Sequence, residues 1–249
     1  ADCGDWRGAL RAELNDPLKV VFQGAYPAAC GERVWPVAYP APREFAARAV
    51  EGMWRELGGK LTGSVREGKV PAGLKPAFVS TSPALAEVVR DVNKYSNNVM
   101  AQHVFLTLAR QKNGVATLDG ARETLRQWWQ ARFADVDAPA PDNGAGLSRD
   151  ARITAQALAR MLQAAWASPV MPELVASLPI AGVDGTLRRS QSRSAAHLKT
   201  GSLRDVMAVA GYVHAQSGRR YVLVAIVNHP NANAARPVLD ALTDWAAKD

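Results

Sequence analysis

Two short polar sequences carry the residue types that could perform chemistry on a peptide. Ser96-Asn97-Asn98 supplies a hydroxyl and two carboxamides, and Lys199-Thr200-Gly201 supplies an ammonium and a hydroxyl. A positioned serine can pass a proton, and a lysine can stabilise negative charge that develops in a transition state. The chain therefore has groups suited to acyl transfer, provided that folding brings the two sequences together.

Each sequence also has a simple structural explanation. Serine and asparagine are favoured just before a helix, so Ser96 to Asn98 could be a helix cap. A lysine on an edge strand can simply be solvated. Taken singly, these explanations are preferred. An unrelated hydrolase that uses Ser96 or Ser202 as its nucleophile is a weaker alternative, because no base is placed near either by the sequence.

Other catalytic signatures are absent from the sequence. There is no H-E-x-x-H, no G-x-S-x-G and no phosphate-binding glycine loop. His103 is expected to be a surface or packing residue, and the two cysteines, Cys3 and Cys30, have no histidine near them. We expect no metal site and no cofactor.

Spacing of apolar residues predicts a change of structure along the first part of the chain. Residues 1–42 alternate short apolar pieces with Gly and Pro, which indicates small β-rich structure with a strand at residues 19–22. Helical spacing then runs from residue 43 to Gly58-Gly59, and a strand is expected at residues 61–65.

Residues 75–180 are predicted to be mainly helical. Ser82 and Ser148 are expected to cap two of the helices, and a break is expected at residues 95–98. The residues expected to point inward are Val99, Val104 and Leu108 after the break, and Ile153, Leu158, Leu162 and Trp166 after Ser148.

The last part of the chain reads as a sheet followed by a helix. Strands are predicted at residues 198–203, 206–214 and 220–228, the last two joined by a turn at residues 216–218. A final helix over residues 234–247 should offer Val238, Leu242 and Trp245 to this sheet. The fold class is thus α/β of the α+β type, a helical block followed by a helix-backed antiparallel sheet.

The sequences around the two motifs narrow the interpretation. DNGAGLSR at residues 142–149 is similar to a DGSGLSR stretch, LPIAGVDGTL at 178–187 looks like an LPxAGxDGTL loop, and LKTGSL at 198–203 is followed by AVAGY at 208–212. In this order, these motifs resemble the class C low-molecular-mass penicillin-binding proteins from about residue 43 to the end. The resemblance implies a penicillin-binding, β-lactamase-like transpeptidase fold and D-alanyl-D-alanine carboxypeptidase activity, with endopeptidase action as an alternative.

The resemblance also implies roles for the catalytic candidates. Ser96 would relay a proton towards the leaving D-alanine, and Asn98 would bind the substrate amide. Lys199 would supply positive charge near the proton path and near the substrate carboxylate.

The substrate-binding candidates follow from the same resemblance. Thr200 would bind the substrate carboxylate, Gly201 would let the substrate lie against the strand edge, and the N–H of Ser202 would be half of the oxyanion hole. Arg149 would either face the incoming peptide or satisfy a helix start. Arg204 stands where the family often has Thr or Gln, which leaves the fine substrate preference open.

The first element of the family, S-x-x-K, occurs nowhere in the sequence. In the family it precedes an inserted domain, so we expect it before Ala1 and expect the chain alone to form no acyl-enzyme. The fold would then be incomplete at its N-terminal side, and the strand at 220–228 would have one edge bare or covered by another chain. Residues 1–42 would be the remnant of an inserted accessory β-rich domain, and 43–249 the penicillin-binding domain without its N-terminal part.

Location and partners complete the expectations. The spacing of Cys3 and Cys30 leaves a free pair or a bridge open; the resemblance implies a disulfide and a periplasmic enzyme. The expected partners are a peptidoglycan stem peptide and, for the full enzyme, β-lactam antibiotics, while a non-catalytic peptidoglycan-binding module is the alternative. The net charge of +7 is scattered, with no interleaved aromatic residues, so nucleic acid is not expected. No apolar stretch is long enough for a transmembrane segment, and the oligomeric state is not predicted.

Overall fold

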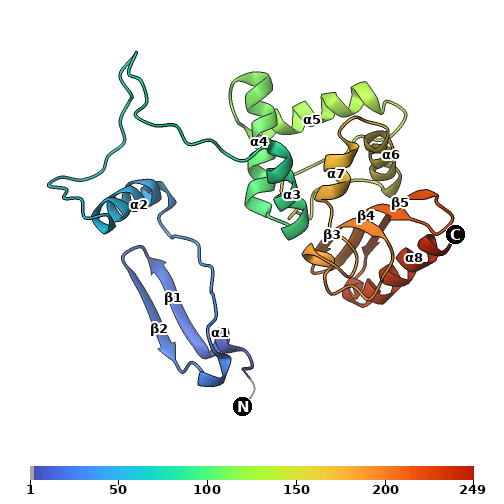
Figure 1. The fold of residues 1–249 in the computed structure, drawn as a ribbon, viewed down its shortest axis with the longest axis horizontal. Coiled ribbons are helices and arrows are strands. Elements are labelled where there is room, and N and C mark those ends of the chain that lie inside the picture. The colour runs from blue at the N-terminus through green and yellow to red at the C-terminus, as the bar shows by residue number, and fades with distance from the viewer. Residues whose placement is uncertain (1–2) are drawn as a thin grey trace. The chain divides into compact units, whose positions relative to one another are not determined.

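The computed structural model describes residues 3–249, which form two compact units that divide between Val79 and Ser80 (Figure 1). The division expected after residue 42 falls inside the first unit. The assignment of residues 1–42 to an inserted domain and of 43–249 to a penicillin-binding domain stays a prediction.

The first unit contains one antiparallel hairpin and one long helix. The strand expected at residues 19–22 is present within β2, whereas its partner β1 was not predicted. No strand forms at residues 61–65, and within the described residues no strand lies beside them to supply hydrogen bonds. Cys3 and Cys30 form a disulfide. The elements are α1 (Trp6–Ala9), β1 (Leu10–Asp16), β2 (Lys19–Gly24), η1 (Ala28–Cys30) and α2 (Pro42–Glu56).

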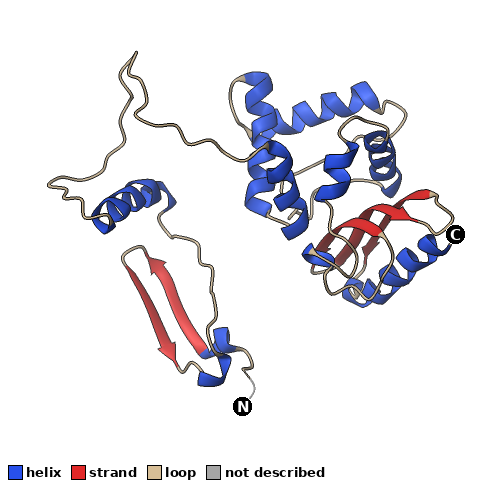
Figure 2. Ribbon diagram, in the orientation of Figure 1, coloured by secondary structure: helices blue, strands red, loops and turns tan. Residues whose placement is uncertain are grey.

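The second unit begins with a block of helices, which agrees with the prediction that residues 75–180 are mainly helical, although α7 was not predicted (Figure 2). They are α3 (Leu85–Tyr95), α4 (Asn98–Asn113), α5 (Leu118–Arg132), α6 (Ala155–Trp166) and α7 (Met171–Ser177). Among residues 3–249, no helix has the length and apolar character needed to cross a membrane.

An antiparallel sheet follows the helical block. Its strands are in the order β3-β4-β5, where β3 is Ala196–Leu203, β4 is Val206–His214 and β5 is Arg220–Asn228. The short helices η2 (Gly185–Leu187) and η3 (Ala232–Ala235) precede β3 and the last helix, α8 (Arg236–Lys248). The positions of the three strands agree with those predicted from the sequence.

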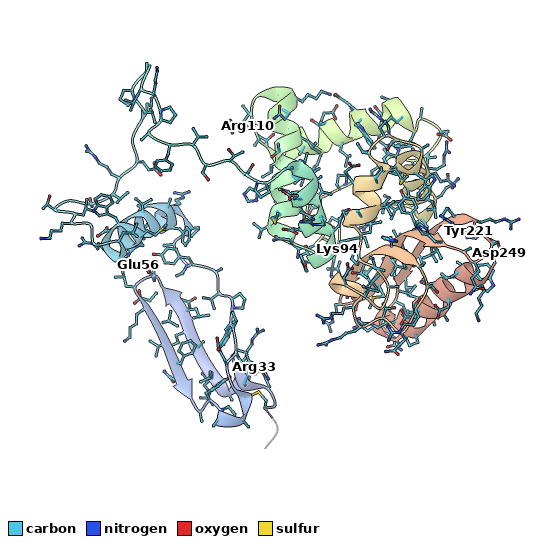
Figure 3. All side chains as sticks on the ribbon, in the orientation of Figure 1. Arg33, Glu56, Lys94, Arg110, Tyr221 and Asp249 are labelled. Atoms are coloured by element: carbon cyan, nitrogen blue, oxygen red, sulfur yellow. A yellow bond between two sulfur atoms is a disulfide. The ribbon has the colours of Figure 1, made fainter. Side chains whose placement is uncertain are left out.

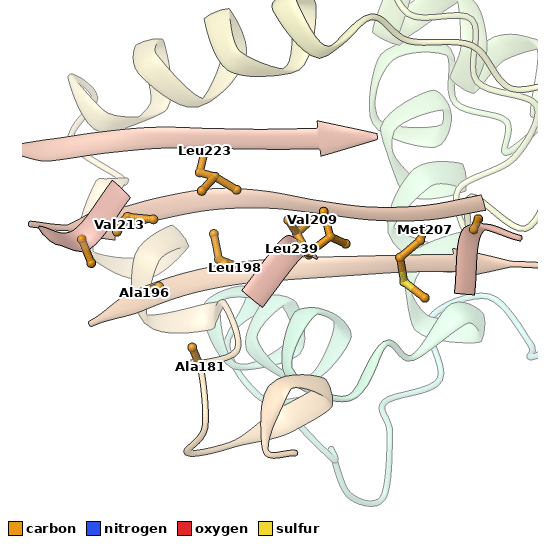
Figure 4. Packing of buried hydrophobic residues seen from close by; sticks show 10 residues of the cluster. Ala181, Ala196, Leu198, Met207, Val209, Val213, Leu223 and Leu239 are labelled. Carbon is orange, nitrogen blue, oxygen red and sulfur yellow. The ribbon is translucent and has the colours of Figure 1, made fainter. Parts of the chain in front are cut away.

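Helices cover both faces of this sheet, and the alternation of side chains assigns each strand residue to one face. Leu198, Val209 and Leu223 point to the face that packs against Leu239 of α8 (Figure 4). On the other face, Tyr212 packs against α6 and α7. Strands covered on both sides are apolar throughout, which explains the continuous apolar run of β5.

Several predicted caps and inward faces are wrong. Thr154 caps α6 by accepting a hydrogen bond from Ala157 N at 3.0 Å, whereas the Ser148 hydroxyl accepts one from Asp150 N in a local turn. Ser82 also precedes its helix without capping it, since α3 begins after Ala84.

The inward face of α4 is carried by Phe105 and Ala109, which pack against α5, so Val99 and Leu108 are left exposed. Val238 and Trp245 of α8 are exposed as well, at 65% and 72%. An amphipathic pattern does not tell which of two adjacent rows of residues meets the neighbouring element.

The strand β5 ends the sheet, and no strand of the described residues pairs with its outer edge. This agrees with the bare edge expected for residues 220–228. A cavity of about 600 Å³ lies beside it, between Tyr221–Val224 and the α8 residues Leu242 and Trp245. Tyr221 and Asp249 are labelled near this edge in Figure 3.

Replacing Tyr212 with Phe should destabilise the second unit without altering its fold. The Tyr212 hydroxyl is buried, donates to the Leu162 carbonyl at 2.7 Å and joins the sheet to α6; burial raises its pKa to about 12. We expect a loss of about 1 kcal/mol in the free energy of unfolding, the net contribution of one such hydrogen bond, measured by urea titration. Tyr95→Phe removes a hydroxyl from a side chain that is 71% exposed and should change nothing. Equal stabilities of the two variants would contradict this account of Tyr212.

Candidate active site

The break between α3 and α4 holds Ser96 in an unusual backbone conformation. Ser96 ends α3 with φ 54° and ψ 49°, and it is the one non-glycine residue with positive φ in residues 3–249. A left-handed conformation costs an L-residue about 1–2 kcal/mol, because its Cβ crowds the following carbonyl. Such strain persists only where the surroundings impose it, and it often marks functional sites.

The helix-cap explanation of Ser96-Asn97-Asn98 applies to the middle residue. Asn97 precedes α4, and its Oδ1 accepts a hydrogen bond from Met100 N at 3.1 Å. Asn98 is the first residue of α4 and is half-buried, next to Ser96. The capping of α4 therefore does not use the hydroxyl of Ser96.

That hydroxyl meets the lysine of the second motif. Lys199 Nζ donates to Ser96 Oγ at 3.1 Å and to the carbonyl of Thr200 at 2.7 Å. Lys199 lies on β3, half-buried, and burial lowers its pKa from the ordinary value of 10.5. The structure thus brings together two sequences that lie 103 residues apart.

The edge of β3 is covered over its first half only. Leu198 N donates to Pro179 O at 2.8 Å, and Ala181 N donates to Ala196 O at 3.0 Å. In an antiparallel strand every second residue turns its backbone groups to the same edge, so Thr200 and Ser202 face this edge as well. The Ser202 N–H therefore points to a margin of the sheet where a peptide could be added as a further strand.

The glycine of the motif is not required by the packing of this chain. A Cβ on Gly201 would meet one atom within 4 Å, the Cβ of Ala208 at 3.8 Å, and Gly201 does not have a positive φ. By contrast, a Cβ on Gly185 would lie 2.4 Å from the Lys94 carbonyl oxygen. A glycine in a strand without such a constraint indicates close approach by something else, such as a ligand.

The remaining binding candidates lie along or beside the same strand. The Thr200 hydroxyl is 2.7 Å from the Thr186 hydroxyl. Arg149 Nη1 donates to Asp205 Oδ2 at 3.3 Å, just beyond the end of β3, so Arg149 does not serve a helix start. Both side chains of this ion pair are exposed, so it adds at most about 1 kcal/mol to stability and leaves Arg149 free to exchange partners.

Three residues of the site region received no role from the sequence. Lys94 in the last turn of α3 is buried, and its Nζ donates to Asp184 Oδ2 at 2.6 Å (Figure 3). Asp184 and Thr186 both belong to the LPIAGVDGTL stretch at 178–187. That stretch was the signal in the sequence that could have indicated these residues. Its pattern does not tell which of its side chains contact the S-x-N and K-T-G regions.

The histidines have other environments. His103 Nδ1 lies 2.8 Å from the carbonyl of Val99 on α4, and His197 and His214 have ring centroids 5.5 Å apart. Burial lowers the pKa of both His197 and His214, so both are neutral at pH 7. In the part of the chain that the structure describes, no group of three or more His, Cys, Asp or Glu side chains is placed to hold a metal ion.

The cavity beside β5 is not the candidate site. The residues that line it belong to β5 and to the last turns of α8, whereas the site lies on β3 at the other edge of the sheet. The polar groups of Ser96 and Lys199 converge outside this cavity, and neither residue lines it.

A D-alanyl-D-alanine carboxypeptidase of Actinomadura sp. (strain R39) is 29% identical over 206 residues, which cover 78% of this chain and 38% of that protein. Carboxypeptidase DacB of Mycolicibacterium smegmatis is 31% identical over 187 residues, covering 70% of this chain and 40% of that protein. The chain thus spans about two fifths of the length of these curated relatives.

A solved structure supports the fold. Penicillin binding protein 4 of Haemophilus influenzae, complexed with a β-lactam, matches with a TM-score of 0.73 at 20% identity over 98% of this chain and 61% of that chain. The expected penicillin-binding fold, with helices and an antiparallel sheet, is confirmed. The sequence pattern of the D-Ala-D-Ala carboxypeptidase 3 (S13) family matches residues 10–249. This match over nearly the whole sequence means that the chain belongs to the D-Ala-D-Ala carboxypeptidase 3 (S13) family.

Proposed function

We propose that this chain is the part of a serine-type D-alanyl-D-alanine carboxypeptidase that carries its S-x-N and K-T-G elements. The enzyme hydrolyses peptidoglycan stem peptides through an acyl-enzyme. The observation that carries the proposal is the 3.1 Å hydrogen bond from Lys199 to Ser96 beside the margin of β3. Curated relatives named as carboxypeptidases favour an enzyme over a non-catalytic binding module.

Ser96 and Lys199 form the proton path in this proposal. Because the Lys199 ammonium donates to Ser96 Oγ, the Ser96 hydroxyl proton must point away from Lys199, towards the substrate. Ser96 then gives this proton to the nitrogen of the leaving D-alanine and receives the one removed from the nucleophile. Asn98, at the start of α4, binds the substrate amide and holds the scissile bond near Ser96.

The strand β3 binds the substrate. Its open edge accepts the peptide as an added strand, with Gly201 leaving room for it. The Thr200 hydroxyl and the Lys199 ammonium bind the terminal carboxylate, and the Ser202 N–H stabilises the oxyanion. Arg149 faces the incoming peptide from beyond the end of the strand.

The nucleophile is contributed from outside these 249 residues, since no S-x-x-K occurs among them. We place the enzyme in the periplasm, where its substrate lies and where a disulfide such as Cys3–Cys30 persists. The completed site also reacts with β-lactam antibiotics, whose ring carbonyl takes the place of the peptide bond.

Labelling with a fluorescent penicillin tests the proposed function. The chain of residues 1–249 alone should remain unlabelled, because it has no serine of the S-x-x-K type. A longer polypeptide that includes the coding sequence upstream of Ala1 should be labelled on one serine there, and that serine changed to alanine should abolish the label. Labelling of a serine within residues 1–249, or none in the longer polypeptide, would contradict the proposal.

Replacements of Ser96 should separate its strain from its function. In the longer polypeptide, Ser96→Ala and Ser96→Gly both remove the hydroxyl, so both should slow penicillin acylation and D-alanine release by about 10²–10⁴-fold and leave a measurable residual rate. Ser96→Gly should be more stable than Ser96→Ala by about 1 kcal/mol in the free energy of unfolding, because glycine tolerates positive φ without a Cβ clash. Urea unfolding of the two variants measures this difference. Equal stability of the two variants would contradict the strain at Ser96, and an unchanged acylation rate in either variant would contradict its role in proton transfer.

Substrate affinity should weaken at alkaline pH because Lys199 loses its charge. Burial lowers the pKa of Lys199, so the ammonium is fully present below this value and is lost as the pH rises through it, before the ordinary 10.5. In the longer polypeptide, KM for a D-Ala-D-Ala peptide should therefore rise over this range. Lys199→Arg, which stays charged, should remove the rise even if its activity is lower. A KM that stays constant up to pH 10.5 in the unaltered enzyme would contradict the carboxylate role.

A further inference from the structure

One segment contacts both the strand β3 and the end of the helix that precedes Ser96. Residues 178–187 are here called the coupling segment. They leave α7, follow the edge of β3, contact the end of α3 and return to β3 at Thr200. Pro179 and Ala181 exchange backbone hydrogen bonds with Leu198 and Ala196, which fixes the start of the segment on β3. In the C-terminal half of the segment, Asp184 and Gly185 contact Lys94, and Thr186 contacts Thr200 of the K-T-G element.

Asp184 fixes the end of α3. Its Oδ2 accepts from Lys94 Nζ at 2.6 Å and its Oδ1 accepts from Ile180 N at 2.7 Å. Burial opposes ionisation of Asp184, but the hydrogen bonds from Lys94 and Ile180 outweigh it and lower the pKa of the carboxyl. The carboxylate therefore stays charged at neutral pH and holds the Lys94 ammonium, whose side chain is 11% exposed.

Backbone packing reinforces the same contact. Gly185 has φ +54° and lies so close to the carbonyl of Lys94 that a Cβ there would be 2.4 Å from its oxygen. Lys94 is thus held by its ammonium and by its backbone, two residues before Ser96. Because Ser96 is in a strained conformation, its position depends on how firmly the preceding turn is held.

Thr186 makes the second connection. Its hydroxyl lies 2.7 Å from that of Thr200, which is the proposed ligand of the substrate carboxylate. A free threonine hydroxyl can rotate among several directions, whereas a hydroxyl hydrogen-bonded to a fixed neighbour has its donor and acceptor directions set.

We propose that Asp184 and Thr186 are positioning residues: Asp184 acts on Ser96 through Lys94, and Thr186 acts on the substrate through Thr200. This inference rests on the proposed function for its kinetic consequences. The geometry assigns different steps to the two residues. Ser96 moves the proton during the chemical step, so loss of Asp184 lowers kcat. Thr200 holds the substrate carboxylate, so loss of Thr186 raises KM.

The positioning role of Thr186 is tested in the longer polypeptide that reacts with penicillin. Thr186→Val should raise KM for a D-Ala-D-Ala peptide about fivefold to tenfold with little change in kcat, the effect expected of one disturbed hydrogen bond. Thr186→Ser should restore KM, because it returns the hydroxyl. Thr124→Val is the matched control, since Thr124 donates to a carbonyl within α5. An unchanged KM in Thr186→Val, or a raised KM in Thr186→Ser, would overturn the positioning role of Thr186.

The positioning role of Asp184 is tested by asking whether its effect on kcat depends on the Ser96 hydroxyl. Asp184→Asn should lower kcat about 100-fold, as a misplaced catalytic group does, but should have no further effect in a Ser96→Ala background. Asp135→Asn, which removes the partner of Arg160 in an exposed ion pair, should leave kcat unchanged. An equal fall in kcat with and without the Ser96 hydroxyl would show that Asp184 does not act through Ser96.

Amide NMR spectra of the 249-residue chain separate a failure of this inference from a failure of the proposed function. Asp184→Asn should shift the amide signals of Ser96 and Asn98, and Thr186→Val should shift that of Thr200, whereas Asp135→Asn should shift none of them. If these shifts occur while the longer polypeptide neither binds penicillin nor releases D-alanine, the positioning holds and the proposed function fails. If activity is present but the shifts are absent, the positioning roles of Asp184 and Thr186 are wrong while the proposed function stands.

Discussion

The hydrogen bond between Lys199 and Ser96 joins the sheet to the helical block. The serine stands in a break between two helices, and the lysine stands on the edge strand of a sheet that is packed on both faces. Neither part can supply the site alone, because the ammonium that bonds Ser96 comes from β3 and the strained hydroxyl comes from the break between α3 and α4. The packing of α6 and α7 on the sheet, with Tyr212 bonded to Leu162, sets the distance between the two parts.

The two edges of the sheet serve different purposes. At β3, residues 179–181 cover the strand as far as Leu198 and leave Thr200 and Ser202 facing outward with polar groups beside them. At β5, the edge that no described strand pairs with adjoins a largely apolar hollow that includes Trp245, and neither motif reaches it. An open edge with converging polar groups can bind a peptide as an added strand. An open apolar edge mainly favours pairing with a strand of another chain.

Much of the fold could be predicted from the sequence, because strand and helix periods are local properties. The three strands of the sheet and the break at residues 95–98 follow from such patterns. The predicted cap at Ser148 was wrong because its hydroxyl satisfies a local turn instead, and the one at Ser82 because α3 begins after Ala84. The contacts of Lys94, Asp184 and Thr186 could not be predicted, since they connect residues that approach only after the helical block packs on the sheet.

The account depends most on whether Ser96 and Lys199 interact in solution. A double-mutant cycle measures this directly, with urea unfolding of the 249-residue chain and of its Ser96→Ala, Lys199→Met and doubly substituted forms. We predict a coupling free energy of about 0.5–1.5 kcal/mol, the range for one hydrogen bond. A coupling of zero within error would mean that the two motifs do not meet, and the proposed site would have to be abandoned.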